Sequence, residues 1–321
     1  MDPDLTVSHY AWSLEAEEPI VIPHANTGNN LRGAFGLALK RLACGNSPNC
    51  QKRCANPDFC AYAHLFESTP PVESRHPSGI QDIPRPFVLK PSRESRSQYA
   101  AGDRLDFGLV LAGNSRRHLP LVAMTFKELE QEGLGISRGR FRLKNIVALD
   151  KAGQPREEVY NWKAGTFRNH EELIRLSDFK PESGIESIEV QFLTPVYLKA
   201  DGQVVQAGLL QFHHLAKRLR DRISSLACFY GDGELQMDFR EFGSLAEKVE
   251  CTSRRLAWVD GQRKSSRTGL WHNLGGLVGR ASFRGDLTPF WPFLKLGELV
   301  HCGKYATFGQ GEFRVQAGKE P

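Results

Sequence analysis

Hydrophobic and polar positions follow the same order of periods in each half of the chain. In the first half, period-two alternation predicts four strands, within residues 10–22, 87–90, 104–112 and 141–149. A helical period predicts two helices, at residues 31–43 and 119–132. The resulting order is strand, helix, strand, strand, helix, strand, which is that of a ferredoxin-like unit.

The second half repeats this order without visible sequence identity to the first. The predicted strands are 188–198, 254–264, 275–284 and 313–315, and the predicted helices are 209–229 and 287–300. Residues 151–185 are polar and show no period, so we interpret them as a linker with an insertion. The pattern predicts an α+β protein of two tandem ferredoxin-like domains, residues 1–185 and 186–321, with a Cys-rich insertion in the first.

A glycine-rich loop lies between the last predicted helix and the last strand. Gly303, Gly309 and Gly311 surround Lys304 in the run HCGKYATFGQGEF. Glycines let a backbone approach another molecule and present its N–H groups, and a lysine among them indicates an anionic ligand. The alternative is a tight connection from helix to strand. The spacing matches neither nucleotide-binding fingerprint, because a helix precedes the loop instead of following it.

Four of the seven cysteines fall within residues 44–60, namely Cys44, Cys50, Cys54 and Cys60. Clustered thiolates suit zinc or an iron–sulfur cluster, and the alternative is a set of thiols without a metal. With four thiolate ligands a metal would have no open position, so its role would be structural and not catalytic.

The composition adds little to the predictions of fold and binding sites made above. The net charge of +5 over 321 residues is too small to define a partner. No apolar run approaches the roughly 20 residues of a membrane span, and the acidic N-terminus lacks the apolar core of a signal peptide. We therefore expect a cytoplasmic protein without a membrane partner.

The distribution of charge is more informative than its total. Basic residues gather near Trp258 and Trp271, with Asp260 as the one acid in that stretch; they are Arg254, Arg255, Arg263, Lys264, Arg267 and Arg280. Cations interleaved with aromatics are typical of surfaces that bind an RNA backbone and stack bases. Two other basic runs, residues 138–144 and 217–222, are equally consistent with solvated faces.

Several segments together resemble one known family. They are LRGAFG (31–36), the cysteine cluster, CAYAHLFE (60–67), GGLVG (275–279), GDLTPF (285–290), LGELVHCGK (296–304) and ATFGQGEF (306–313). This combination is similar to the CRISPR precursor-RNA-processing endoribonucleases, the sixth CRISPR-associated family, within the RAMP superfamily. The resemblance implies two ferredoxin-like domains and metal-independent cleavage of CRISPR repeat RNA to 2′,3′-cyclic phosphate and 5′-hydroxyl ends. It also implies that the protein stays bound to crRNA, with effector-complex subunits as further partners.

The resemblance further implies site residues. Cleavage without a metal needs a base, an acid and a cation, and the candidates are His24, Lys40 and His301. Expected RNA contacts are the basic stretch above together with Arg32, Gly303, Lys304, Thr307, Phe308, Gly309 and Gly311. No catalytic cofactor is expected.

Two other functions stay open. Leu37 stands where many members of the family carry a histidine, which favours an inactive RNA-binding subunit of an effector complex. A metal enzyme unrelated to RNA, with the cysteines as its centre, is the third interpretation.

Overall fold

The computed structural model describes residues 3–23, 27–44, 60–68, 83–168, 170, 172–181, 183–264, 269 and 271–318, with only the backbone of Arg263, Lys264 and His272. The chain packs into two units. The N-terminal unit comprises Val7–Ile174 and Phe229–Gly231, and the C-terminal unit comprises Met1–Thr6, Arg175–Cys228 and Asp232–Pro321. The main division falls inside the segment that lacks a period in the sequence.

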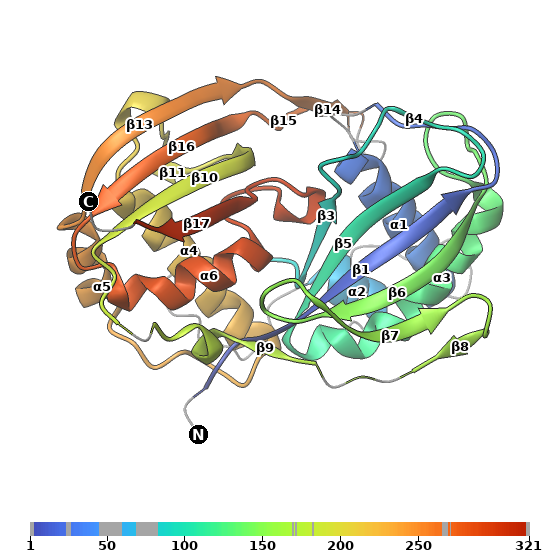
Figure 1. Ribbon diagram of the computed structural model, residues 1–321, viewed down its shortest axis with the longest axis horizontal. Helices are drawn as coiled ribbons and strands as arrows, with labels where there is room; N and C mark the ends of the chain where they lie inside the picture. Colours follow the sequence, from blue (N-terminus) through green and yellow to red (C-terminus); the bar gives the residue numbers. More distant parts are fainter. Residues whose placement is uncertain are drawn as a thin grey trace. The chain divides into compact units, whose positions relative to one another are not determined.

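The N-terminal unit has the ferredoxin-like order of strands and helices (Figure 1). Its strands are β1 (Thr6–Ala16), β2 (Ile20–Val21), β3 (Phe87–Pro91), β4 (Gln98–Tyr99), β5 (Arg104–Ala112), β6 (Phe141–Leu149), β7 (Pro155–Asn161) and β8 (Thr166–Phe167), with β9 (Ile174–Arg175) at its end. Its helices are α1 (Thr27–Ala43), α2 (Ala61–Phe66) and α3 (Leu119–Glu132), and the 3-10 turn η3 (Gly113–His118) precedes α3. The main sheet runs β3-β5-β1-β6-β7-β8 and the pairs are antiparallel.

One face of this sheet and the helices α1 and α3 enclose the first core. Trp12 of β1 stacks on Phe107 and contacts Phe126 of α3, and Phe126 stacks on Phe35 of α1. Trp12, Phe35 and Phe126 are at most 1% exposed, so the apolar stripe of each helix is buried against the apolar side of the strands. The other side of the sheet carries the polar residues that alternate with this core.

The C-terminal unit repeats the arrangement, as the sequence pattern predicts. Its strands are β10 (Ser187–Val196), β11 (Lys199–Ala200), β12 (Gln203–Val204), β13 (Glu250–Val259), β14 (Gln262–Lys264), β15 (Trp271–Asn273), β16 (Gly276–Arg284) and β17 (Phe313–Ala317). Its helices are α4 (Phe212–Tyr230), α5 (Phe239–Glu247) and α6 (Trp291–Val300). The four-stranded sheet has the order β13-β16-β10-β17, and α4 and α6 pack on one face of it around Phe212, Phe290 and Phe313.

Several elements were not expected from the sequence pattern, among them β7, β8, α2 and α5. β7 and β8 lie in the segment interpreted as a linker, α2 lies in the cysteine-linked motif, and α5 follows α4. α2 has six residues, which is too short for a helical period to show, and most of β7 is exposed, so it lacks the alternation that marks a half-buried strand.

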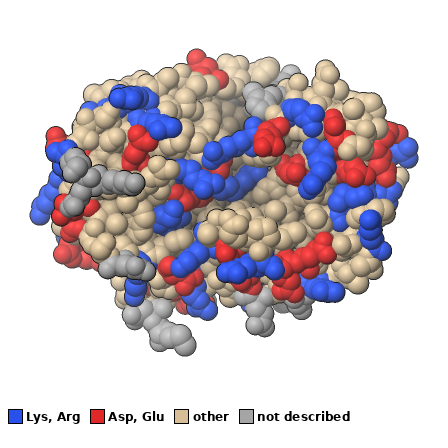
Figure 2. Space-filling model, in the orientation of Figure 1, with Lys and Arg blue, Asp and Glu red and all other residues tan. Residues whose placement is uncertain are grey.

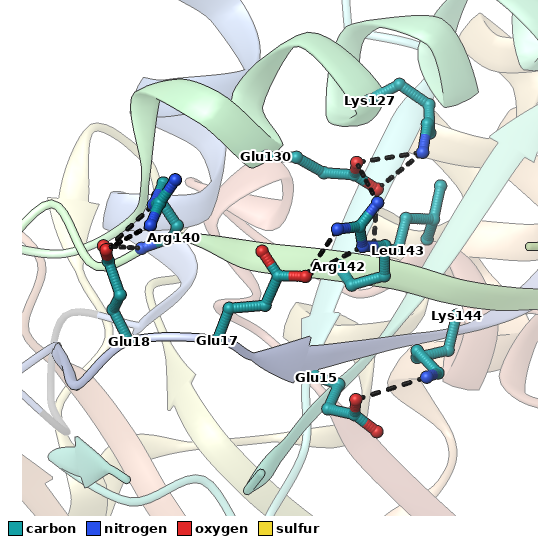
Figure 3. Close-up of polar contacts among 9 residues, drawn as sticks. All are labelled: Glu15, Glu17, Glu18, Lys127, Glu130, Arg140, Arg142, Leu143 and Lys144. Carbon is teal, nitrogen blue, oxygen red and sulfur yellow. Dashed lines mark hydrogen bonds and ion pairs between the residues drawn. The ribbon is translucent and has the colours of Figure 1, made fainter. Parts of the chain in front are cut away.

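Each unit uses a glutamate of little exposure to hold a backbone N–H of the strand that follows α3 or α6. Glu130 of α3 accepts a hydrogen bond from the Leu143 amide at 2.8 Å and pairs with Lys127, three residues earlier (Figure 3). Glu298 of α6 accepts from the amide of Val315 at 2.7 Å and pairs with Lys295. The two units therefore share this contact, a helix glutamate that accepts from a strand amide and pairs with a lysine three residues earlier, as well as the order of their elements.

Two glycines of α1 give a prediction about stability. A Cβ on Gly36 would lie 2.8 Å from Cε1 of Phe66, whose ring is held by Phe35 and Phe87, while a Cβ on Gly33 would meet nothing within 4 Å. We expect Gly36→Ala to lower the free energy of unfolding by about 1–3 kcal/mol through overpacking. Gly33→Ala, the matched control, should raise it by roughly 0.5–1 kcal/mol because alanine favours the helix. Urea denaturation measures both, and equal effects would contradict this packing of α1 on α2.

Candidate nucleic-acid interface

A row of cations crosses the face of the C-terminal sheet that is not packed on its helices. Strand pairing aligns Arg255 of β13 with Arg280 of β16, Arg280 with Gln191 of β10, and Gln191 with Arg314 of β17. The three arginines are exposed, whereas alternate residues of the same strands, such as Ala281, Phe313 and Val315, belong to the core on the other face. We call Arg255, Arg280, Gln191 and Arg314 the arginine row. Adjacent strands lie about 4.8 Å apart, so the row spans roughly 14 Å.

The row is only partly neutralised by acids. Arg280 pairs with Glu189 at 2.9 Å, and both side chains stay about half exposed. Lys and Arg side chains gather over this sheet in Figure 2. Exposed guanidinium groups at strand spacing suit the phosphates and base faces of a nucleic-acid strand.

The N-terminal sheet differs in this respect. Arg140, just before β6, and the cations Arg142 and Lys144 of β6 each meet a glutamate at or just after the end of β1 (Figure 3). The pairs are Arg140 with Glu18 at 2.7 Å, Arg142 with Glu17 at 2.6 Å, and Lys144 with Glu15 at 3.2 Å. The pKa of Glu18 is held below its usual range mainly by the hydrogen bond from Arg140. Arg140, Arg142 and Lys144 are therefore each matched by an acid, whereas in the arginine row the described ion pairs include only that of Arg280.

The basic stretch of β13 divides between the two faces of its sheet. Arg255 points outward, but Arg254 turns to the helix side, where its Nε donates to the Leu210 carbonyl at 2.7 Å. Adjacent strand residues point to opposite faces, so the two cannot both serve one exposed surface. Arg254, expected to contact RNA, instead binds the segment before α4. The side chains of Arg263 and Lys264, and the whole of Arg267, lie outside the described residues.

The basic run of α4 is largely structural. Arg218 donates to the Lys199 carbonyl at 3.0 Å, Arg220 to the Phe239 carbonyl at 2.6 Å, and Arg222 to the Val300 carbonyl at 2.8 Å. These bonds connect α4 to β11, α5 and the end of α6. The sequence left two interpretations of this run open, a solvated face and an RNA surface. These hydrogen bonds to backbone carbonyls fit neither of them.

Many backbone N–H groups of the glycine-rich loop are already used in hydrogen bonds within the protein, contrary to what the sequence suggests. Backbone N–H groups of Cys302, Phe308 and Gly309 donate within the loop, and those of Lys304 and Gly311 donate to the carbonyls of Tyr197 and Pro195. The expectation that glycines present N–H groups to an anion is wrong for these five amides. Gly303 (φ 80°) and Gly311 (φ 75°) instead allow left-handed turns close to other backbone atoms.

Lys304 itself is exposed, and its neighbours are aromatic. Its Nζ lies 5.5 Å from the ring centroid of Tyr197, whose ring contacts Trp258 edge-on at 6.1 Å. The Trp258 Nε1 donates to Asp260 at 3.0 Å. Thr307 and Phe308, by contrast, are each 9% exposed. The loop therefore offers a lysine beside Tyr197, whose ring in turn contacts Trp258, and this arrangement suits contact with a phosphate and a base.

His301 occupies an unusual backbone conformation. Its φ of 61° and ψ of 169° lie in a region that is essentially restricted to glycine. The side chain is fully buried, with Nδ1 3.0 Å from the Gln310 carbonyl oxygen. This geometry favours the interpretation of His301 as a residue that ties the loop together.

Lys40 and Arg32 lie on one side of α1, against the aromatic residues of α2. Lys40 Nζ is 5.4 Å from the ring centroid of Tyr62, and the Arg32 guanidinium is 5.1 Å from that of Phe66. The two rings are stacked at 5.3 Å, and the Tyr62 hydroxyl is 3.5 Å from Glu67. Tyr62, which the sequence did not single out, thus supplies a phenol next to Lys40. Leu37 is 60% exposed on α1, and His24 lies outside the described residues.

The same contacts bring two of the four cysteines to one end of the helix pair. Late in α1, Lys40 contacts the start of α2, whereas Arg32, early in α1, contacts its end, so the helices run in opposite directions. Cys44 follows α1 and Cys60 precedes α2, and both are partly exposed. Cys50 and Cys54 lie outside the described residues, and within the described ones no group of three or more His, Cys, Asp or Glu residues is arranged to hold a metal.

Another part of the N-terminal unit brings two histidines together. His64 of α2 and His118 of η3 have ring centroids 4.9 Å apart. Burial lowers the pKa of each to about 4, Arg117 adds to the effect on both, and His64 adds to the effect on His118. Both imidazoles are therefore neutral near pH 7.

Acidification should destabilise this unit. The unfolded histidines take up protons below pH 6.5, whereas the folded pair resists protonation down to about pH 4, so stability is complete above pH 6.5 and falls as the pH decreases. Because both side chains are partly exposed, we expect a loss of only about 1–3 kcal/mol between pH 7 and pH 5. Urea unfolding of the wild type and of His118→Gln at pH 7 and pH 5 measures this loss of stability. If the free energy of unfolding decreased equally in the two proteins, the pair of His64 and His118 would be excluded as the source of the decrease.

No helix among the described residues has the length and apolar character to span a membrane. Residues 5–172 match the family model AF_1859_N, an N-terminal domain, and residues 190–313 match the model of the CRISPR-associated endoribonuclease Cas6. An uncharacterized protein of Archaeoglobus fulgidus is 28% identical over 297 residues, which cover 90% of this chain and 91% of that protein.

Solved structures agree with the fold described above. A Cas6 product complex has a TM-score of 0.58 at 15% identity, covering 97% of this chain and all of that chain. Thermus thermophilus Cas6 has a TM-score of 0.55 at 15% identity, with 97% and 99% covered. A Cas6-RT-Cas1–Cas2 complex has a TM-score of 0.56 at 15% identity, covering 99% of this chain and 29% of that chain. At these identities the similarity concerns the fold alone.

Proposed function

We infer that the chain is a member of the Cas6 family of CRISPR-associated endoribonucleases, because residues 190–313 match the model of that family. We propose that it binds CRISPR repeat RNA in the cytoplasm, cleaves precursor crRNA, and keeps the product for an effector complex. The observation that carries the RNA-binding part is the arginine row, three exposed arginines in register across an open sheet. Surfaces of this kind attract a phosphate backbone without a metal.

The proposed chemistry is attack of a 2′-hydroxyl on the adjacent phosphate. The 2′-oxygen forms a bond to phosphorus and loses its proton to a base, while the bond to the 5′-oxygen breaks and that oxygen takes a proton from an acid. The products are a 2′,3′-cyclic phosphate and a 5′-hydroxyl. His24 is the proposed acid or base. Lys40 is the cation that stabilises the charged phosphorane, and the neighbouring Tyr62 phenol adds a hydrogen-bond donor.

One experiment tests this function. Purified protein is incubated with the CRISPR repeat RNA of its source genome in excess EDTA, and the product ends are identified by their response to phosphatase and kinase. Cleavage at one position, with a cyclic phosphate end, supports the proposal. Lys40→Ala should lower the rate about 10²-fold, as is typical for removal of one charge-stabilising donor. Cleavage that needs a divalent metal would overturn the mechanism.

A second function is favoured by a specific observation at Leu37. This side chain is 60% exposed on α1, at the position where the family resemblance leads one to expect a histidine. The chain would then be a crRNA-binding subunit without nuclease activity. Tight binding of repeat RNA with no cleavage over hours would support this function over the first.

We also propose a structural metal bound by Cys44, Cys50, Cys54 and Cys60. The antiparallel pair of α1 and α2 supports it, since the first and last cysteines lie at the same end. Thiolate ligands suit zinc or an iron–sulfur cluster, which would close the connection between the helices. Metal analysis of the purified protein should find a stoichiometric metal that Cys44→Ser and Cys60→Ser each remove. A metal-free wild-type protein would refute the site.

A further inference from the structure

The loop between α3 and β6 is built like the glycine-rich loop of the other unit. The residue after each helix combines a positive φ with an extended ψ, at 76° and 169° for Gly133 and 61° and 169° for His301. The next residue in each loop is buried, Leu134 in one and Cys302 in the other. The two loops therefore leave their helices in the same way.

The far ends of the two loops also correspond. Leu134 and Gly139 exchange backbone hydrogen bonds at 3.0 and 3.1 Å, and the Cys302 amide donates to the Gly311 carbonyl at 3.0 Å. A strand follows each of these glycines after one residue, beginning at Phe141 and Phe313. Loop 133–139 is thus the N-terminal counterpart of the glycine-rich loop, although its sequence does not resemble a nucleic-acid motif.

The tip of loop 133–139 is fixed by contacts with the segment after β1. The Ile136 amide donates to the Val21 carbonyl at 2.9 Å, the Val21 amide to Ser137 Oγ at 2.9 Å, and Ser137 Oγ to the Pro19 carbonyl at 3.0 Å. A tip held in this way loses little conformational freedom when it binds a ligand.

Two exposed side chains project from this tip. Ile136 is 73% exposed, the highest value among the large hydrophobic residues that the structure describes. Arg138 is also exposed and has a φ of 51°. In the described part of the chain Arg138 forms no ion pair, whereas Arg140 is paired with Glu18. An apolar side chain thus stands beside a cation that none of the described acids neutralises.

We propose that loop 133–139 is a second RNA-contacting loop, in which Ile136 packs on an unpaired base and Arg138 holds a neighbouring phosphate. Apolar side chains such as isoleucine pack against bases at unstacked steps, and arginine is a common phosphate ligand. A nucleotide combines a flat apolar face with a negative charge, which matches this pair of side chains. The inference rests on the proposed function, because the ligand is the same RNA.

Equilibrium binding of a fluorescein-labelled single-stranded repeat RNA tests the loop. Ile136→Ser should weaken binding about 5- to 10-fold without changing its dependence on salt, because no charge is lost. Arg138→Gly should weaken binding by a similar factor and reduce the slope of log affinity against log salt by about 0.7. Since glycine accepts the left-handed conformation of residue 138, the unfolding midpoint of Arg138→Gly should not decrease.

Met124→Ser is the matched control, since Met124 is 58% exposed on α3 of the same unit and should not affect binding. If both loop variants bind like the wild type while Arg314→Ala binds more weakly, the loop proposal is overturned and the proposed function stands. If the wild type binds no RNA, the proposed function itself fails. A loop variant that changes only self-association or protein binding would also overturn the RNA assignment.

Discussion

Replacing Gly311 with alanine is expected to cost more stability than any other single change considered for this chain. A Cβ at this position would lie 1.8 Å from the Cys302 carbonyl oxygen, and the residue has a φ of 75°. Backbone carbonyl oxygens cannot move aside as a side chain can. The Gly311 amide and carbonyl are also fixed, by bonds to Pro195 and Cys302, each at 3.0 Å. We therefore expect a loss of at least about 3–4 kcal/mol, from backbone strain and overpacking together.

Guanidinium denaturation of the full chain, followed by fluorescence, measures this loss. Gly208→Ala is the control, because a Cβ at Gly208 meets no atom within 4 Å and the change should stay within about 0.5 kcal/mol. RNA affinity should fall together with stability for Gly311→Ala, since Lys304 is part of the same loop. A Gly311→Ala protein with the wild-type midpoint would show that the loop does not close through Cys302 and Gly311.

His301 lies in the same loop and shows how much of this region the sequence could predict. The end of a helix was expected at Val300, because the helical period stops there, and α6 does end at that residue. The glycine-like conformation of His301 was not predictable, because nothing in the residue type indicates it. Gly133, at the corresponding position of the N-terminal unit, has the residue that such a conformation usually requires.

Element boundaries were predicted best where one face of an element is buried. β5, α3 and β6 begin and end at the expected residues, since alternation or a helical period marks them from end to end. The candidate site was predicted less well, because it depends on which residues of separate strands are paired. Arg255, Arg280 and Arg314 fall into one row only through the register of three strand pairs, and no local pattern contains that information.

The alternation of side chains along a strand could have predicted that Arg254 and Arg255 lie on opposite faces of the sheet. Adjacent residues of a strand point to opposite faces, so a continuous basic run on a strand cannot form one surface. The sequence could not predict that Arg254 binds the carbonyl of Leu210, because Leu210 lies 44 residues earlier in the chain. Similarly, only the structure shows that Glu15, Glu17 and Glu18 pair with Lys144, Arg142 and Arg140.

Removing the three arginines of the arginine row is expected to have the largest effect on RNA binding. In the variant Arg255→Ala/Arg280→Ala/Arg314→Ala, three cations disappear from one continuous surface, while the residues facing the core stay unchanged. Each phosphate contact with single-stranded RNA contributes about 0.7 to the slope of log affinity against log salt, so the slope should decrease by about 2. At roughly 0.15 M salt we expect affinity to fall about 10²- to 10³-fold.

The control must remove the same charge from other parts of the same unit. Lys180, Arg240 and Lys248 are all exposed, and the variant Lys180→Ala/Arg240→Ala/Lys248→Ala changes the net charge by the same amount. If RNA were attracted only by the overall charge of the protein, the two variants would lose equal affinity. A loss confined to the arginine row, with unchanged unfolding midpoints, would instead assign binding to this surface, because the strand pairs there align three cations in one row, with Gln191 between Arg280 and Arg314.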